Sequence, residues 1–188
     1  PRAPRLDAPD KATGRAVYTD DIRRPGMLHG AILHSPHAHA RIKRIDVSRA
    51  QALPGVHAVI TAADAPATRY GVSPARYDET VFATGKVRHV GEELAAVAAD
   101  NREIALQALD AIEGEYEQLP VVLDAREALA PGSPVIHELY PGNLNAEVHQ
   151  EFGDVESVRS RAAVVRSGRL ESEMQDGAFL EPQSAIAE

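Results

Sequence analysis

Three histidines near the start of the chain are the first residues whose spacing could support chemistry. His34, His37 and His39 form an H-x2-H-x-H cluster. A zinc site needs three or four nitrogen, sulfur or oxygen ligands that converge on the ion. On a strand His37 and His39 would share a face, but Pro36 interrupts the geometry before His34 can join them, and the chain has no cysteine. The ligand count therefore favours structural or surface histidines over a metal centre or a small metal-dependent hydrolase.

A second group of candidate ligand-binding side chains lies in residues 61–86, where two prolines and two glycines predict a long loop. A loop of this length inside a compact domain is often functional or held by a partner. The alternative is a surface excursion without chemistry. Four of its side chains could bind an acidic ligand, although nothing in the sequence fixes their relative positions: Arg69, Tyr70, Arg76 and Tyr77.

The elements that must position these residues begin with the stretch 28–60. The apolar run Leu28–Leu33 and an imperfectly alternating run that starts at Ala40 predict two strands. Asp46 and Ser48 are both possible N-caps of a short helix. A third strand, Val56–Ile60, follows directly after a Pro-Gly turn. We expect the glycine of that turn to need a positive φ.

A second strand–helix–strand unit follows the loop. Leu94–Ala98 is an apolar strand, and Asn101 is placed to cap a helix over Arg102–Ile112. Glu113–Leu119 predicts the next strand, which Pro120 ends. Together with the first stretch, this unit predicts two mixed α/β layers around one core.

Past Pro120 the composition changes, and Pro-Gly pairs at 131–132 and 141–142 predict a linker that crosses between domains. Asp154 can cap a short helix that runs through Arg161. The weak alternation of Val164–Leu170 predicts a strand whose apolar residues have no partner sheet in this sequence.

Composition narrows the possible functions. The 28 acidic and 20 basic residues give a net charge of −8, which disfavours binding to nucleic acid or to an anionic membrane. No apolar run approaches the ~20 residues of a membrane span. The absence of cysteine excludes a disulfide, a thiolate nucleophile and a cysteine-ligated iron–sulfur cluster from this chain, and it fits a cytoplasmic protein. The glycines show neither a GxGxxG nor a P-loop spacing, so no phosphate-binding loop is predicted.

Several separated motifs occur in one order: SPHAHARIKRIDVSRAQALPGVHAVITAAD, KVRHVGEELAAVAAD, EGEYEQLPVVLDAREAL and FGDVESV. In this order they closely resemble the amino-terminal hammerhead α/β domain of the molybdenum subunit of the xanthine dehydrogenase and aldehyde oxidase family. The run His149–Val155 is similar to the 4-hydroxybenzoyl-CoA reductase alpha-subunit branch of that family. The resemblance covers about residues 5–158.

The resemblance implies an α/β fold, with a mixed α/β hammerhead domain followed by the start of a second α+β domain. The corresponding divisions are residues 1–119 for the hammerhead domain with an extended amino-terminal segment, 120–148 for a linker, and 149–188 for an incomplete molybdopterin-binding domain. It also implies an oxidoreductase of the molybdenum hydroxylase type, which oxidises a heterocycle, an aldehyde or an aromatic thioester substrate.

In this family the molybdenum–molybdopterin cofactor and a late glutamate base belong to regions downstream of the hammerhead domain, and 2Fe-2S clusters and FAD sit on partner domains or subunits. We therefore assign no catalytic, cofactor-binding or metal-ligating residue to this chain and expect it to be inactive alone. The expected partners are the remainder of the molybdenum subunit and iron–sulfur and flavin subunits in a hetero-oligomer. The alternative is a free-standing hammerhead binding or assembly module without catalysis.

The end of the chain resembles the opening of the family's molybdenum-binding region, through a QExxxLE-like run over Gln175–Glu181. Gly177 stands where many relatives carry a histidine. Glu181 is the residue to test for proximity to an active site, and the alternative is an ordinary carboxylate at a strand end beside Pro182.

Overall fold

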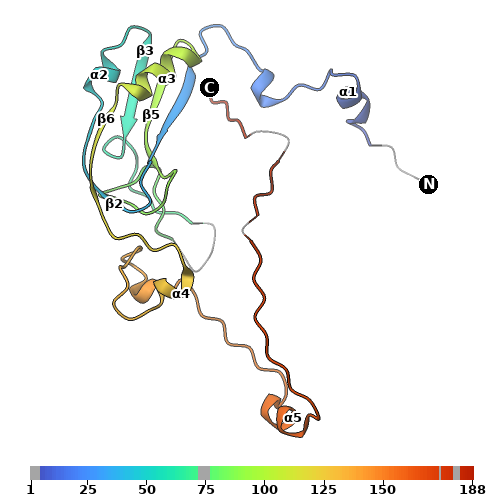
Figure 1. Ribbon diagram of the computed structural model, residues 1–188. Helices are drawn as coiled ribbons and strands as arrows, with labels where there is room; N and C mark the ends of the chain where they lie inside the picture. Colours follow the sequence, from blue (N-terminus) through green and yellow to red (C-terminus); the bar gives the residue numbers. More distant parts are fainter. Residues whose placement is uncertain (1–4, 72–76, 174, 180–182) are drawn as a thin grey trace. The chain divides into compact units, whose positions relative to one another are not determined.

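The structure is a computed structural model that describes residues 5–71, 77–173, 175–179 and 183–188. The chain separates into two compact units, which we describe one at a time. Residues 26–148 form one unit, and residues 1–25 together with 149–188 form the other. Figure 1 shows the elements of each unit.

The 26–148 unit contains two three-stranded antiparallel sheets. The first has the order β1-β5-β3, with bounds β1 His29–His34, β5 Glu93–Ala99 and β3 Val56–Thr61. The second has the order β4-β2-β6, with bounds β4 Lys86–Val87, β2 Ala40–Asp46 and β6 Glu113–Gln118. The mixed α/β fold expected from the sequence is confirmed, and the predicted strands at 28–33, 56–60, 94–98 and 113–119 lie within two residues of their observed bounds.

Helix α3 (Arg102–Asp110) covers one face of the first sheet, next to α2 (Ser48–Gln51). Asn101 caps α3 as predicted, because its side-chain oxygen accepts a hydrogen bond from the Ile104 amide at 2.9 Å. Asp46 accepts from the Ser48 amide at 3.0 Å and so orders the start of α2. The main core lies between these helices and the sheet: Ala50, Val59, Ala95, Val97, Ala99, Ala105, Ala108 and Ile112.

The two sheets meet at a smaller apolar cluster of Ala40, Ala83, Val87 and Leu94. β2 can face both cores because its pairing with β6 shifts register between Ile42 and Arg44. The bulge explains the imperfect alternation in the sequence, since it lets Ile42 pack on the smaller cluster and Ile45 on the main one.

Residues 120–148 carry α4 (Ala125–Ala128) and the 3₁₀ turn η2 (Pro141–Asn143), and they lie within the 26–148 unit. Asp124 caps α4 through the amides of Arg126 and Glu127. The side chain of Asn143 holds the loop between α4 and η2 in place, because it donates to the carbonyl oxygens of Ala128 and Pro134. This segment is therefore ordered by its own polar contacts, and its assignment as an interdomain linker stays a prediction.

The other unit carries little regular structure. It contains α1 (Ala8–Ala12), η1 (Thr19–Asp21) and α5 (Val155–Arg161), and Asp154 caps α5 as predicted. The strand predicted over Val164–Leu170 is wrong, because these residues form no ladder and lie exposed, with Leu170 fully exposed. Among the described residues of this unit, they have no neighbouring strand to pair with. In the described part of the chain, no helix is long and apolar enough to cross a membrane.

Candidate functional site

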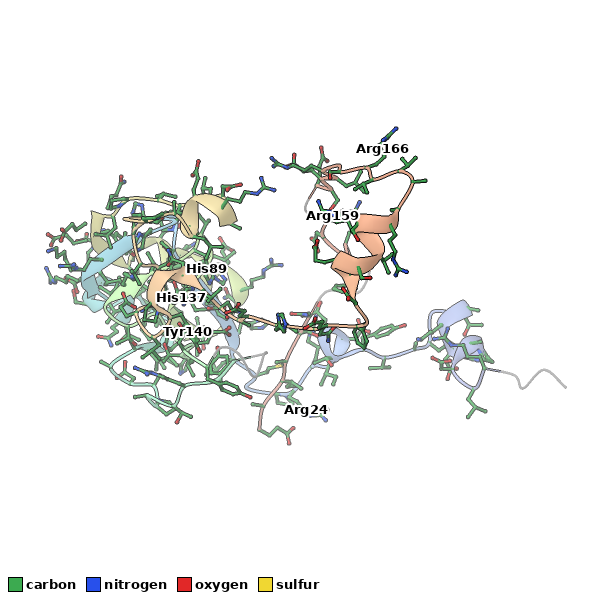
Figure 2. All side chains as sticks on the ribbon, turned by 90° about the horizontal axis from the view of Figure 1, so that it is seen from below. Arg24, His89, His137, Tyr140, Arg159 and Arg166 are labelled. Atoms are coloured by element: carbon green, nitrogen blue, oxygen red, sulfur yellow. The ribbon has the colours of Figure 1, made fainter. Side chains whose placement is uncertain are left out.

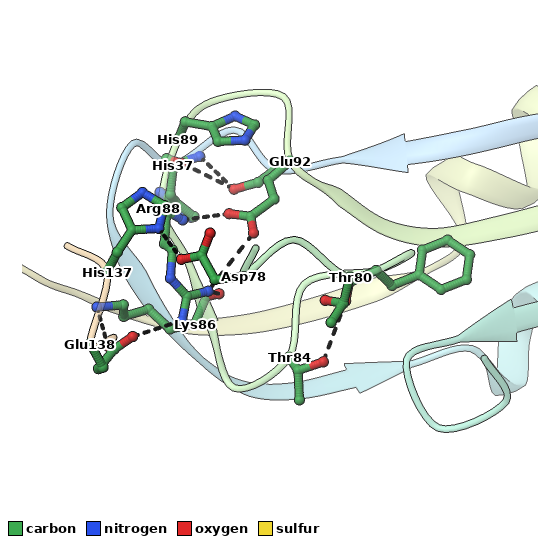
Figure 3. A network of polar contacts seen from close by, with 12 residues as sticks. His37, Asp78, Thr80, Thr84, Lys86, Arg88, His89, Glu92, His137 and Glu138 are labelled. Carbon is green, nitrogen blue, oxygen red and sulfur yellow. Dashed lines mark hydrogen bonds and ion pairs between the residues drawn. The ribbon is translucent and has the colours of Figure 1, made fainter. Parts of the chain in front are cut away.

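A group of charged side chains in the 26–148 unit lies where residues 135–138 meet the loops on either side of β4 (Figure 3). Lys86 Nζ lies 2.5 Å from Glu138 Oε1, and Arg88 Nη2 lies 2.9 Å from Glu138 Oε2. His137 Nδ1 lies 2.5 Å from Asp78 Oδ2. We call Asp78, Lys86, Arg88, Glu92, His137 and Glu138 the polar clamp.

The backbone around β4 explains how these side chains converge. β4 pairs with β2 through Val87 opposite Ala40, which fixes Lys86 and the residues that follow it. The chain then turns at Gly91, whose φ is +90°. Glu92 closes the turn, because its carboxylate accepts a hydrogen bond from the Arg88 amide at 2.5 Å.

The cations of the polar clamp are more buried than its central carboxylate. The Lys86 and Arg88 side chains are 13% and 20% exposed, and that of Glu138 is 59% exposed. Partial burial alone would raise the pKa of Glu138, but hydrogen bonds from Lys86 and Arg88 outweigh it and lower the pKa from the usual 4.5 to about 2. Glu138 is therefore ionised whenever the protein is folded near neutral pH.

A pocket of about 240 Å³ adjoins the polar clamp. Four carboxylates line it: Asp78, Glu79, Glu92 and Glu93. The other lining residues are Tyr70, Thr80, Arg88, His89 and His137. A histidine beside a carboxylate is an arrangement that can serve a general base, but it needs a nucleophile within reach. Two hydroxyls line this pocket, and both donate to backbone carbonyl oxygens: that of Thr80 to Phe82 at 2.7 Å, and that of Tyr70 to Thr80 at 3.4 Å. The arrangement can hold segments together, and the described residues that line the pocket assemble no nucleophile–base pair.

The three histidines singled out in the sequence have separate roles. His34 Nδ1 lies 2.7 Å from the carbonyl oxygen of Gly91, and the ring of His37 packs against Tyr116 with centroids 4.8 Å apart. His39 is buried, and its Nδ1 lies 2.7 Å from the carbonyl oxygen of Pro120. Within the described ranges, no group of three or more His, Cys, Asp or Glu side chains could hold a metal ion.

The loop residues proposed to bind an acidic ligand do not form one site among the described residues. Tyr70 lines the pocket. The Tyr77 amide donates to the Tyr140 hydroxyl at 2.9 Å, and Figure 2 labels Tyr140 in the 26–148 unit. Arg69 is exposed. Arg76 and Glu181 lie outside the residues that the structure describes.

Sequence reasoning missed the polar clamp because the pairs that His137 and Glu138 make join residues 50 to 59 positions apart. Ion pairs at that separation leave no periodic signal. One indirect signal was present: the long loop at 61–86 was expected to be functional or held by a partner. In the structure its carboxyl-terminal part is held by residues 135–140 of the same chain.

Residues 26–148 thus form an antiparallel two-sheet α/β unit with an internal polar clamp. Its sequence places it in a family. Residues 13–120 match the model for the aldehyde oxidase and xanthine dehydrogenase a/b hammerhead domain. The chain belongs to this family, and it corresponds to part of the molybdenum subunit.

The chain is similar to named relatives over most of its own length. It is 43% identical over 134 residues to the carbon monoxide dehydrogenase large chain of Hydrogenophaga pseudoflava, which covers 70% of this chain and 17% of the relative. It is 35% identical over 195 aligned positions to the nicotine 6-hydroxylase large subunit of Paenarthrobacter nicotinovorans, covering 100% of this chain and 24% of the relative. The chain therefore spans less than a quarter of each of these two relatives.

Among solved structures, quinoline 2-oxidoreductase from Pseudomonas putida 86 matches with a TM-score of 0.69 and 39% identity, over 76% of this chain and 19% of that one. The family resemblance expected from the sequence is confirmed. The more specific assignment to the 4-hydroxybenzoyl-CoA reductase branch stays a prediction.

Proposed function

We propose that this chain is the amino-terminal scaffold of the molybdenum subunit of a molybdopterin-dependent oxidoreductase that oxidises a heterocycle, an aldehyde or an aromatic thioester. The observation that carries the proposal is the family match over residues 13–120, which falls largely within the compact 26–148 unit. A scaffold role is supported by polar side chains that contact other segments of the same chain and so hold them together. Catalysis then belongs to the rest of the enzyme.

The domain boundaries belong to the same proposal. Residues 1–119 act as the hammerhead domain with its amino-terminal extension, residues 120–148 as the connection, and residues 149–188 as the start of the molybdopterin-binding domain. The exposure of the apolar residues Val164, Leu170 and Phe179 supports the last assignment, because such side chains favour burial against further protein.

The described residues of this chain do not fit the molybdopterin cofactor that the family implies. The pocket beside the polar clamp is lined by four carboxylates, whose negative charge would repel the phosphate of a pterin cofactor. Its one arginine already contacts Glu138. The cofactor is proposed to bind to the remainder of the subunit, with 2Fe-2S clusters and FAD on partner domains or subunits.

Metal content and association test this proposal together. The 188-residue chain is purified alone and after co-expression with the remainder of the molybdenum subunit. We expect no stoichiometric molybdenum, iron or flavin in the chain alone, and a stable complex that contains molybdenum and reduces a redox dye with substrate. Stoichiometric molybdenum in the chain alone would contradict the scaffold role. Failure to associate would favour a free-standing binding or assembly module.

A further inference from the structure

The two sheets of the 26–148 unit present outward faces of opposite character. On the β4-β2-β6 sheet, alternate residues of β6 are glutamates, and two of them face arginines of β2: Glu115 faces Arg44 and Glu117 faces Arg41. Lys43 Nζ lies 2.5 Å from Glu117 Oε2, and Arg44 is paired in register with Glu115. Such cross-strand ion pairs are typical of a sheet face that meets water.

The outward face of the β1-β5-β3 sheet carries no charge in its two complete cross-strand rows. One row places Ile32, Ala96 and Ile60 side by side, and the next row places Gly30, Ala98 and Ala58 side by side. We call these six residues the open face. The opposite side of the same strands is buried under α2 and α3 through Ala95, Val97 and Ala99.

The open face is accessible within the 26–148 unit. Ile32 and Ile60 are 48% and 43% exposed. Farther along β5 the same face is closed, because Leu94 is buried in the small cluster where the two sheets meet. Charged residues make up 26% of the sequence, and a solvated antiparallel sheet ordinarily places polar side chains on its outer face. Two uncharged rows are the composition of a surface that another part of the protein covers.

The open face also has a definite relief. Ile32 and Ile60 flank the methyl group of Ala96, so this row is raised at its ends and low at its centre. The neighbouring row holds only glycine and alanine and is low throughout. Large apolar side chains from a helix or strand would fill this depression. The lack of charge fits a permanent interface, since obligate interfaces are more apolar than transient ones.

We propose that the open face is the docking site for the portion of the molybdenum subunit that lies outside this sequence, which presents large apolar side chains to β1, β3 and β5. The inference rests on the proposed function. The choice of occupant follows from length: this chain covers 17% and 24% of the two relatives described above, so most of such a subunit is available to cover the face. Transient partners would favour a more polar surface.

Cysteine accessibility tests the proposal directly, because the chain has no cysteine of its own. Ile32→Cys and Ile60→Cys place a thiol on the open face, and Glu115→Cys places one on the charged face of the other sheet as a matched control. Maleimide labelling rates are measured for each variant alone and in complex with the remainder of the subunit. We expect the first two variants to label at least ~10-fold more slowly in the complex, and the control to label at the same rate in both states.

The outcomes separate the two proposals. A complex that forms while Ile32→Cys and Ile60→Cys label at unchanged rates overturns the docking site and leaves the proposed function standing. If no complex forms, both fail. If the isolated chain labels slowly, and more slowly at higher protein concentration, a second copy of the chain covers the open face. That result would overturn the remainder of the molybdenum subunit as the occupant.

A charge substitution provides an independent readout. Ile60→Glu should weaken the complex by at least ~10-fold, while the melting temperature of the isolated chain stays nearly unchanged, because the side chain is already 43% exposed there. The control Glu115→Gln should leave the complex intact. If Ile60→Glu and the unsubstituted chain bind the remainder of the subunit with equal affinity, the proposal is overturned.

Discussion

Gly55 occupies the turn between α2 and β3, where a single added methyl group should be costly. Its φ is +83°, in the region that side chains rarely adopt, as the Pro-Gly sequence predicts. A Cβ atom built there would lie 2.8 Å from Ile104 Cδ1 and 2.9 Å from Asp100 Oδ2. Both atoms end flexible side chains, but Ile104 packs on the main core and Asp100 Oδ1 lies 2.7 Å from His57 Nε2.

The destabilisation of Gly55→Ala can be built from two parts. The positive φ costs about 1 kcal/mol for a residue with a Cβ. Displacing Ile104 and Asp100 adds about 1–2 kcal/mol, at the lower end for overpacking because both side chains can move. The sum of about 2–3 kcal/mol corresponds to a melting temperature lower by roughly 4–12 °C for a chain of this size. Gly55→Val should cost at least as much.

Thermal unfolding followed by circular dichroism measures the effect. Gly85→Ala is the matched control: its φ is +74° and no atom lies within 4 Å of the added Cβ, so it reports the backbone cost alone, about 1 kcal/mol. Gly55→Ala should therefore melt several degrees below Gly85→Ala. Equal melting temperatures would refute the crowding argument, and an unchanged melting temperature for Gly55→Ala would refute the assigned turn.

Three further predictions concern the helix cap, the polar clamp and the tail. Asn101→Ala should lower the stability of the chain by about 1 kcal/mol, measured by urea denaturation, through loss of the α3 cap. The pKa of Glu138 in the folded chain, about 2, lies below the usual 4.5, so the unfolded chain binds more protons between these values. Its stabilising contribution is complete above pH 4.5 and lost as the pH falls towards 2, and the stability gap between the unsubstituted chain and Glu138→Gln should shrink over that window in pH-dependent urea denaturation. Trypsin should cut first at Arg159 and Arg166, labelled in Figure 2, and leave a fragment containing residues 26–148 by mass spectrometry, whereas early cuts inside that range would contradict its compactness.

Local chemistry accounts for what the sequence could predict. α3 was predictable because an asparagine cap precedes an apolar stripe at helical spacing, and both effects act within one element. β5 was predictable because one face is buried under the helices and its outward residues Ala96 and Ala98 are apolar and partly buried, so the strand is an almost continuous apolar run. The positive φ of Gly55 followed from the Pro-Gly pair and the strand directly after it.

Features that depend on distant residues were not predictable in the same way. The bulge in β2 appears only when Ile42 and Ile45 each find a separate core. The loop at 61–86 contributes buried Phe82 and Ala83 to the unit, although its composition signals only a break in regular structure. Val164–Leu170 shows the reverse error, since its alternation suggests a strand but a strand needs a neighbour.

The order in which the polar clamp is made has a consequence for synthesis on the ribosome. The two sheets are complete once β6 has emerged at Gln118, but the ion pairs of Lys86 and Arg88 with Glu138 form only when Glu138 follows, 20 residues later. At about 5–20 residues per second, that interval lasts roughly 1–4 s. During that interval both sheets can form while residues 135–140 do not yet hold the loop at 61–86. We expect a chaperone or a protease to reach this loop most easily then.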